Sequence, residues 1–580
     1  MGAVTGGITL ITSTKAFRTH FPGGSAYAQS IPPEPVSTCT QPANSPPTRP
    51  FLQALPIPPV ATPVASLSPA PTKNANISGG EAPRAAHQRW NEFQPRVYYD
   101  VHTRPALHQF HPDIPPTYVW GFNGLVPGPT FISNYNTPIL VRFHNELPVN
   151  HTGFGINEMT VHLHNGHTAS ESDGFAGDFY GPGFFKDHHY PNILAGYDEF
   201  PQTNGDPREA MGSLWYHDHR HSFTAPNSYR GLAGMYLLFD DRDTGNENDT
   251  RPSALRLPSG YGVYDIPIII GSKLFCPDGQ LFSNNPGAVP LGDKWVVNGA
   301  IQPYLQVKRR KYRFRFLNTG PALGWNLTMS DDRPFTVIAT DANLLESPIN
   351  VPTLPLNVAE RYDVIFDFSD TAIGDKLYLL NDRPQFVNNG PEPHDLPPSV
   401  KLEDVVMRFD VVGDAPDSPP IPDVLAEYPP VDLNEVVGTR IWDFDLVNGQ
   451  FLINGKVFDA NRSDAQIQKG TAEKWILRNK LKKATWSHPV HIHFEEFRVL
   501  SRNGGPPPQL ETGRKDVIIM PPLSEVELFM RFRNFTGKYM IHCHNMNHED
   551  NFMLVRWDIV DNPPPQPIST FIPAKKGGVG

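Results

Sequence analysis

One short pattern occurs three times along the 580-residue chain and restricts what the chain can fold into. An apolar run before Asn-Gly appears as VWGFNGLVPGPTF (119–131), KWVVNGAIQPYLQV (294–307) and QFLINGKVFDAN (450–461). Each copy is followed by a strand-like stretch of basic and apolar residues: ILVRFHNEL, KYRFRFLN and EKWILRN. The copies lie about 150 to 180 residues apart, which is too far for a solenoid. The pattern predicts three β-domains of one type.

The composition favours the same fold class. Proline (63 residues) and glycine (46 residues) divide the apolar residues into short runs, such as YDIPIIIG at 264–271. Short apolar runs between turn residues are typical of buried sandwich strands, so we expect an all-β chain. We expect a truncated export leader at residues 1–28 and a Pro-rich arm at 29–84. Three domains follow at 85–245, 246–420 and 421–570, and then a tail at 571–580.

The amino-terminal segment carries two signals. The apolar run AVTGGITLIT and the small-x-small triplet Ala26-Tyr27-Ala28 fit an export leader, although basic residues before the run are missing. A disordered tail is the alternative interpretation. From Ile31 to Thr72, 13 of 42 residues are proline, which favours an extended linker or an arm on the surface. If the protein is exported, we expect it in the periplasm, outside the cell, or on the surface of a spore or cell.

The net charge restricts the class of binding partner, and the cysteines allow one disulfide. A net charge of -11 without long Lys or Arg runs argues against nucleic acid or an anionic membrane as the main partner. No segment reaches the ~18 to 20 apolar residues that cross a bilayer. We therefore expect a small-molecule substrate. One bridge between Cys39 and Cys276 is conceivable, but a sequence cannot show that their α-carbons come within about 7 Å.

Histidine gathers in four short motifs: VHLHNG, WYHDH, HPVHIH and HCHNMNHEDNFM. On a strand, residues i and i+2 share a face about 6.5 to 7 Å apart, so each His-x-His directs two imidazoles into one space. Eight imidazoles are too many for one ion. The spacing therefore predicts a cluster of two or three metal ions where two domains meet, built from His162, His164, His217, His219, His491, His493, His542 and His544.

Cys543 stands between two of these histidines, so strand alternation directs its sulfur to the opposite face. There it can be joined by His488, His548 and Met553. Two histidines and one cysteine with a distant thioether form the trigonal blue-copper set. The pattern predicts an electron-transfer copper connected through Cys543 and its neighbours to the multinuclear cluster.

The four motifs, in this order and spacing, resemble those of the multicopper oxidases, from about residue 88 to the end. TWSHPVHIHFEEFRVLSRNGG is similar to bilirubin oxidase and spore-coat laccase, in a group that also includes phenoxazinone synthase. The resemblance implies three cupredoxin-like Greek-key β-sandwich domains and four copper ions. It assigns the type 1 copper to His488, Cys543, His548 and Met553, the type 2 copper to His162 and His491, and the type 3 pair to His164, His217, His219, His493, His542 and His544.

The resemblance also implies roles for two acids and one tryptophan. Asp173 and Glu549 match the positions that relay protons in this family; the alternative is a surface carboxylate and a strand-end acid. Trp486, two residues before a predicted type 1 ligand, is expected either at the surface where electrons enter or in the core.

The expected function is one-electron oxidation of phenols, aminophenols or a tetrapyrrole such as bilirubin, with reduction of dioxygen to water by an exported, monomeric enzyme. One alternative is a metallo-oxidase for Cu(I) or Mn(II), which the eleven methionines and the lack of a Met-rich insert disfavour. The other is a copper-binding electron-transfer protein without oxygen reduction. That class would lack one or more of the four His-x-His pairs.

Overall fold

The computed structural model describes residues 33–574, except 36–38, 41, 43, 284–286, 383–395, 483–485 and 568. The predicted leader, 1–28, lies outside these residues. Strands dominate the described chain, whose only α-helices are α1 (Ser170–Asp173), α2 (Thr224–Arg230) and α3 (Met546–Asp550). The all-β prediction is confirmed. No helix in the described ranges is long and apolar enough to cross a membrane.

The first sandwich consists of two four-stranded sheets. The order in one is β2-β1-β4-β6, with bounds Thr117–Phe122, Val97–His108, Ile139–Asn145 and Phe185–Tyr190. The order in the other is β3-β8-β7-β5, with bounds Phe131–Asn134, Ala233–Phe239, Ser213–Asp218 and Val161–His164.

The second sandwich has a seven-stranded and a five-stranded sheet. The first has the order β11-β10-β9-β13-β18-β15-β16, with bounds Ala300–Ile301, Lys294–Val297, Asp265–Lys273, Lys311–Asn318, Arg361–Asp367, Phe335–Thr340 and Asn343–Val351. The other has the order β12-β20-β19-β14-β17, with bounds Tyr304–Arg309, Val405–Asp414, Lys376–Asn381, Trp325–Met329 and Leu354–Leu356.

The third sandwich repeats this plan. One sheet has the order β22-β21-β24-β29-β26-β27, with bounds Gln450–Ile453, Val436–Val447, Thr471–Asn479, Glu525–Phe532, Phe497–Arg502 and Arg514–Lys515. The other has the order β23-β31-β30-β25-β28, with bounds Ala465–Gln468, Leu554–Val560, Gly537–Cys543, His488–Ile492 and Val517–Met520. β32 (Phe571–Pro573) pairs with β21, so part of the segment expected to be a tail forms a strand.

The threefold sequence pattern corresponds to one structural unit in each sandwich. A central strand pairs antiparallel with the strand before Asn-Gly and parallel with the basic and apolar strand that follows, as in β2-β1-β4, β10-β9-β13 and β22-β21-β24. The Asn φ angles are 49 to 56° and the Gly φ angles 70 to 84°, as a type I′ turn requires. Each Asn side chain also accepts a hydrogen bond from the central strand, at 2.7 to 2.8 Å. The two positive φ angles and the hydrogen bond of the Asn side chain together explain why Asn-Gly occurs at these three places.

The Pro-rich segment is an arm that runs along the first two sandwiches. It forms isolated bridges from Ala54 to Tyr304 in the second sandwich and from Val60 to Thr130 beside the first. A disulfide joins Cys39 to Cys276, with their α-carbons 6.1 Å apart. The pairing that the sequence left open is therefore present, and it fastens the arm to the second sandwich.

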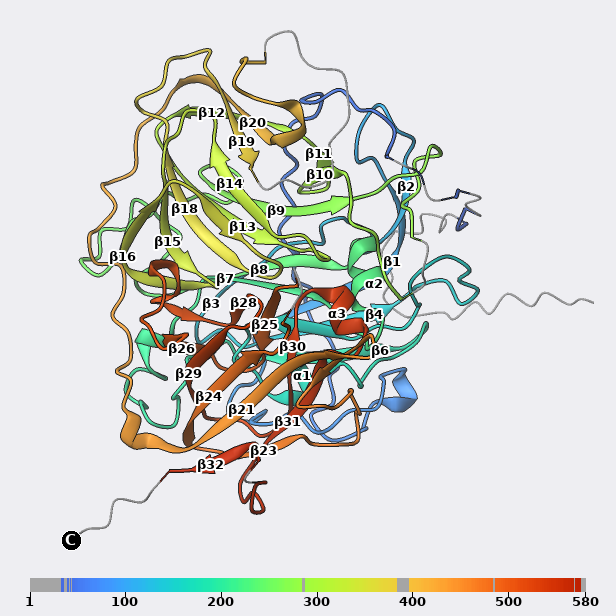
Figure 1. The fold of residues 1–580 in the computed structure, drawn as a ribbon, viewed down its shortest axis with the longest axis vertical. Coiled ribbons are helices and arrows are strands. Elements are labelled where there is room, and N and C mark those ends of the chain that lie inside the picture. Colours follow the sequence, from blue (N-terminus) through green and yellow to red (C-terminus); the bar gives the residue numbers. More distant parts are fainter. Residues whose placement is uncertain are drawn as a thin grey trace, which may run out of the picture.

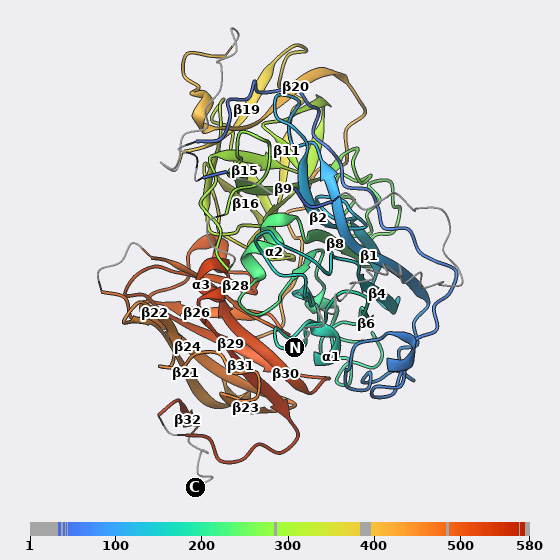
Figure 2. The ribbon, with the colours of Figure 1, turned by 90° about the vertical axis from the view of Figure 1, so that its right-hand side faces the viewer.

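The three sandwiches surround a common centre (Figure 1). The view turned by 90° shows the third sandwich, in orange and red, beside the first, in blue and cyan, with the second above both (Figure 2). At the junction of the first and third sandwiches, α1 packs against β30 and α2 packs against α3. The strands that carry the histidine motifs end here. The domain boundaries drawn from the sequence stay a prediction.

Candidate metal centre

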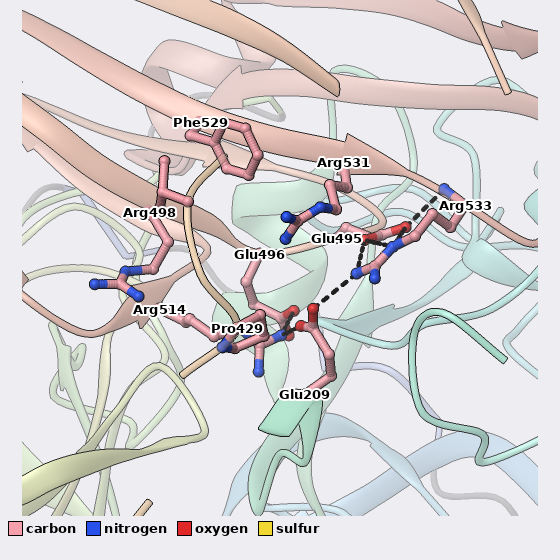
Figure 3. Close-up of a pocket in the computed structure, with 10 residues that line it drawn as sticks. Glu209, Pro429, Glu495, Glu496, Arg498, Arg514, Phe529, Arg531 and Arg533 are labelled. Atoms are coloured by element: carbon pink, nitrogen blue, oxygen red, sulfur yellow. Dashed lines mark hydrogen bonds and ion pairs between the residues drawn. The ribbon is translucent and has the colours of Figure 1, made fainter. Parts of the chain in front are cut away.

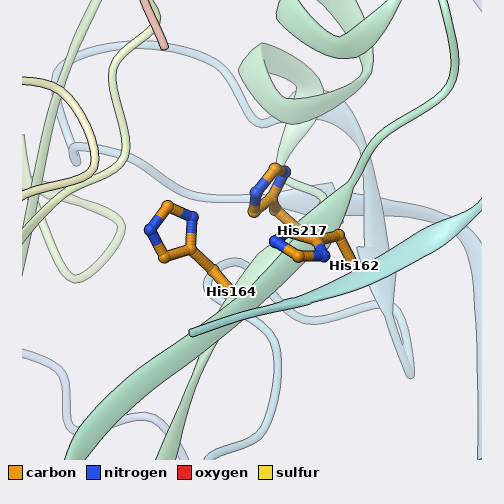
Figure 4. Close-up of side chains that lie close together, drawn as sticks. All are labelled: His162, His164 and His217. Atoms are coloured by element: carbon orange, nitrogen blue, oxygen red, sulfur yellow. The ribbon is translucent and has the colours of Figure 1, made fainter. Parts of the chain in front are cut away.

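Two pairs of antiparallel strands present the histidines at the junction of the first and third sandwiches. In the first, β5 and β7 place His162 opposite His217, and Figure 4 shows His162, His164 and His217 close together on these strands. In the third, β25 and β30 place His491 opposite His542. All eight imidazoles of the four His-x-His pairs are buried, at 0 % exposure. The folded chain therefore brings the eight predicted residues together.

The imidazoles lie close to one another across the junction. His162 Nε2 and His491 Nε2 face each other across the junction at 3.4 Å. His542 Nε2 lies 3.3 Å from His219 Nε2 and 3.2 Å from His493 Nε2. The His544 ring centroid lies 5.1 Å from that of His164 and 5.2 Å from that of His217. Other rings are closer still, with centroids 3.7 Å apart for His164 and His491 and 3.8 Å apart for His162 and His493, so the imidazoles form one continuous cluster across both sandwiches.

Burial keeps seven of these imidazoles neutral by lowering their pKa, and several ring nitrogens make no hydrogen bond to described residues. Burial, reinforced by neighbouring histidines, lowers the pKa of His217 to about 3 and of His219 to about 4, and it holds the pKa of His544 well below its ordinary value. His164 Nδ1, His217 Nε2 and both nitrogens of His544 are buried without a hydrogen-bond partner among the described residues. Unprotonated nitrogens with free lone pairs are metal ligands. The site therefore fits a group of metal ions.

A second site lies on the other face of β30. Cys543 Sγ lies 3.4 Å from His488 Nδ1 and 3.7 Å from His548 Nδ1, and the two nitrogens are 3.2 Å apart. Metal–ligand bonds of about 2.0 to 2.3 Å place three trigonal ligands roughly 3.5 Å apart, so this triangle has the size that one ion needs. Met553 is buried in the same apolar cluster as Cys543.

The second site approaches the surface through one tryptophan. Trp486 is 47 % exposed, and its ring centroid lies 5.0 Å from that of His548. The ring of Phe451 packs against the same imidazole, at 4.2 Å between centroids. Of the two positions expected for Trp486, the structure shows the surface one.

Asp173 is buried beside the histidine cluster, at the end of α1. Its Oδ2 accepts a 2.7 Å hydrogen bond from His493 Nδ1, and its carbonyl oxygen accepts one of 2.5 Å from His162 Nδ1. Oδ1 has no hydrogen-bond partner among the described residues. Burial raises the pKa of this carboxyl well above its ordinary value. Asp173 is therefore not a surface carboxylate.

Glu549 is buried on the opposite side of the cluster, on α3. Its Oε2 lies 3.1 Å from His542 Nδ1, out of line for a hydrogen bond, and its Oε1 accepts a 2.8 Å bond from Thr224 Oγ1. Burial acts to raise its pKa, but His542 and His219 outweigh that effect and lower it to about 2.

Asp516 and Arg361 also contribute to the site, although no sequence motif marks them. Asp516 Oδ1 accepts a 3.0 Å hydrogen bond from His164 Nε2, and the Asp516 carbonyl oxygen accepts one of 2.9 Å from His491 Nδ1. Arg361, on β18 of the second sandwich, donates to both carboxylate oxygens. All three sandwiches thus meet at Asp516. Neither residue belongs to a motif, so no local signal pointed to them.

A separate pocket at the junction is filled by paired charges. Glu209 of the first sandwich forms ion pairs with Arg514 and Arg533 of the third, and these arginines also pair with Glu496 and Glu495 (Figure 3). All five side chains are at most 5 % exposed. This network joins the two sandwiches that carry the histidines, and its carboxylates are paired with arginines.

Comparisons with known proteins agree with this architecture. Three multicopper oxidase models match residues 108–182, 277–397 and 430–563. The chain is 36 % identical over 477 residues to a bilirubin oxidase of Albifimbria verrucaria, covering 80 % of this chain and 76 % of that protein. It is 31 % identical over 526 residues to a laccase of Bacillus subtilis strain 168, covering 80 % and 95 %.

A solved structure shares the fold. The laccase from Pediococcus acidilactici superposes with a TM-score of 0.70 at 24 % identity, covering 89 % of this chain and 95 % of that one. The resemblance drawn from the motifs is confirmed. The family implies copper, and the buried histidine groups fit it. The chain belongs to the multicopper oxidases and is a copper-dependent oxidoreductase that uses dioxygen as electron acceptor.

Proposed function

We propose that this oxidase holds four copper ions and oxidises small aromatic reductants in the manner of a laccase or bilirubin oxidase. The trigonal site, formed by Cys543, His488 and His548 with Met553 beside them, would hold the type 1 ion, and the eight clustered histidines would hold the other three. The assignments are His488, Cys543, His548 and Met553 for type 1, His162 and His491 for type 2, and His164, His217, His219, His493, His542 and His544 for type 3. When bound, the ions store the four electrons that reduction of dioxygen to water requires.

The observation that carries this proposal is the position of Cys543. Its sulfur is close to His488 and His548, while His542, the preceding residue, contacts the cluster through Nε2. Three consecutive residues of the chain, 542–544, therefore connect the two sites covalently. This gives electrons a short through-bond path from the trigonal site to the histidine cluster.

The two buried carboxyl groups can relay protons beside the cluster, Asp173 as a donor and Glu549, which is ionised near neutral pH, as an acceptor. Asp173 can hold a proton on Oδ1, the oxygen that makes no hydrogen bond, while Oδ2 orients His493. On the other side, Glu549 contacts Thr224 through Oε1 and lies next to His542. Water formation consumes protons inside a closed site, so an acid on each side provides a route for them.

The exposed face of Trp486 supports a broad range of electron donors. A flat donor that stacks on this exposed ring comes close to His548. Such contact selects for aromatic character and a suitable potential more than for shape. Phenols, aminophenols and tetrapyrroles such as bilirubin meet this requirement. Comparing turnover of a phenol, bilirubin, Cu(I) and Mn(II) separates this proposal from a metallo-oxidase.

The decisive variant is Cys543→Ser. It should remove the blue absorption and phenol oxidation and lower the copper content from four to three ions per chain. Far-ultraviolet circular dichroism should stay unchanged, because the serine fits the space of the buried thiol. Retention of phenol oxidation by the folded variant would show that electrons do not pass through Cys543. A colourless wild-type protein that binds a single zinc would refute the copper assignment itself.

We also propose that the protein is exported. The disulfide between Cys39 and Cys276 supports this, because disulfides persist mainly in oxidising compartments. The expected signal-peptidase triplet, 26–28, lies outside the described residues. The expectation of a monomer stays a prediction.

A further inference from the structure

Two histidines and two carboxylates gather on the outer side of the first sandwich. Asp100 and His102 lie on β1, His144 lies on β4, and Glu146 follows β4 directly. β1 and β4 run parallel with His102 opposite His144, and residues two apart on a strand share a face. The four side chains therefore project from one face of the sheet. Their exposed fractions, 19 to 43 %, show that solvent reaches all of them.

Three of these residues converge on one point. His144 Nε2 lies 2.8 Å from Asp100 Oδ1, and His102 Nε2 lies 3.7 Å from Asp100 Oδ2. The two imidazole rings stack with centroids 4.6 Å apart and planes 5° apart. One ligand atom from each of the three residues lies within 4.8 Å of the others. A small cation with bonds of about 2.0 to 2.2 Å has its ligands roughly 3 to 4 Å apart, so small side-chain rotations complete the set.

Glu146 fixes the orientation of one imidazole. Its Oε1 lies 2.8 Å from His102 Nδ1, on the opposite side of the ring from Asp100. In neutral histidine this contact places the proton on Nδ1 and leaves the Nε2 lone pair free. A carboxylate behind a metal-binding imidazole commonly has this role in protein metal sites. The cluster thus has the outer contact of a metal site as well as three possible ligands.

We propose that Asp100, His102 and His144 bind a divalent transition-metal cation of the zinc class, with Glu146 orienting His102. Two imidazoles and one carboxylate suit zinc, copper or nickel better than magnesium or calcium, which prefer oxygen. Solvent access leaves room for water as a further ligand. The site shares no residue with the histidine cluster or the trigonal site, and an ion here connects β1 to β4.

The competing interpretation is an ion-pair cluster without metal. The nearby carboxylates of Asp100 and Glu146 raise the pKa of His102 to about 9, so a proton can occupy the position of the cation. The two interpretations differ in what zinc does. A metal site binds one zinc ion through His144 and Asp100 together, whereas exposed ion pairs bind zinc weakly and without a fixed stoichiometry.

The test is calorimetric titration of the copper-loaded, full-length protein with Zn²⁺. Wild type should bind one equivalent of zinc, and His144→Ala and Asp100→Asn should each weaken binding at least tenfold. Glu146→Gln should weaken it about tenfold, in line with the loss of an orienting partner. His108→Ala is the matched control, because this imidazole lies on the same strand but bonds only the Gly299 carbonyl oxygen, and its zinc affinity should equal that of wild type.

Zinc should also raise the thermal inactivation temperature of wild type but not of His144→Ala. The blue absorption, recorded throughout, shows whether the copper sites stay intact. The proposal is overturned if wild type takes up no zinc beyond its copper, or if His144→Ala and Asp100→Asn bind zinc as wild type does.

Discussion

Substitution of Asp516 tests how the second sandwich supports the histidine cluster. In Asp516→Asn the side chain keeps its shape but loses its charge. With the amide oxygen at the Oδ1 position, the amide NH2 group faces the second Arg361 nitrogen, which now bonds Oδ2, and two donors oppose each other. Turning the amide over relieves that contact but removes the acceptor of His164 Nε2. The Arg361 guanidinium is fully buried, and its next carboxylate, Asp341, is 3.7 Å away.

Two magnitudes follow from this geometry. Removing one partner of a buried ion pair costs about 3 to 5 kcal/mol of folding stability. Losing the contact that orients a metal-binding imidazole lowers metal affinity about 10- to 100-fold, or about 1.4 to 2.7 kcal/mol. Copper should therefore leave the histidine cluster more readily, whereas the trigonal site should keep its ion because Asp516 contacts none of Cys543, His488 or His548.

The assay is dialysis against a graded chelator series, with copper per chain and blue absorption measured at each step. The variant should lose cluster copper at a 10- to 100-fold lower chelator concentration while the blue absorption persists. Asp410→Asn is the matched control, since Asp410 forms a partly exposed ion pair with Arg408 on β20, and it should lose less than about 1 kcal/mol. Equal chelator resistance of wild type and Asp516→Asn would refute the positioning role.

Three further outcomes are expected. Glu209→Gln should destabilise the protein by about 3 to 5 kcal/mol near neutral pH. Burial acts to raise the pKa of Glu209, but Arg514 and Arg533 hold it at about 2, so the stabilisation by its charge is present above about pH 4.5. The difference in stability from wild type should disappear as the pH falls towards 2, which thermal inactivation measured against pH would show. Cys39→Ser should lower resistance to heat, by about 2 to 4 kcal/mol, without changing the blue absorption. Asp173→Asn should slow oxygen consumption about 10²- to 10⁴-fold at unchanged blue absorption, and normal turnover would exclude a proton role.

Strand periodicity explains why much of the metal centre could be predicted from the sequence. Within 542–544, a repeat of two residues decides that the sulfur and the flanking imidazoles face opposite ways, and no tertiary information is needed. The same reasoning assigns one face to each His-x-His pair. The Asn-Gly repeat was equally visible, and it recurs because each copy forms a turn that only a few residue types accept, with two successive positive φ angles.

Contacts between distant segments could not be predicted in this way. Asp516 occurs in RKDVIIM, where a charged residue before an apolar strand normally points to solvent. Its contact with Arg361 depends on how two sandwiches dock, and no spacing in the sequence encodes that. The arm and the disulfide of Cys39 are similar cases, since the α-carbon separation of 6.1 Å arises between residues 237 positions apart.

The second sandwich carries none of the twelve predicted copper ligands, yet the structure gives it a physical task. Imidazoles at a junction keep their relative positions only if the two sandwiches that carry them cannot shift against each other. Arg361 prevents this at one point by binding Asp516, which in turn holds His164 of the first sandwich and His491 of the third. Because the guanidinium is buried and needs its carboxylate, any displacement of one sandwich separates charges in a poorly solvated interior. Through this contact, the second sandwich couples the spacing of the metal ligands to the stability of the whole fold.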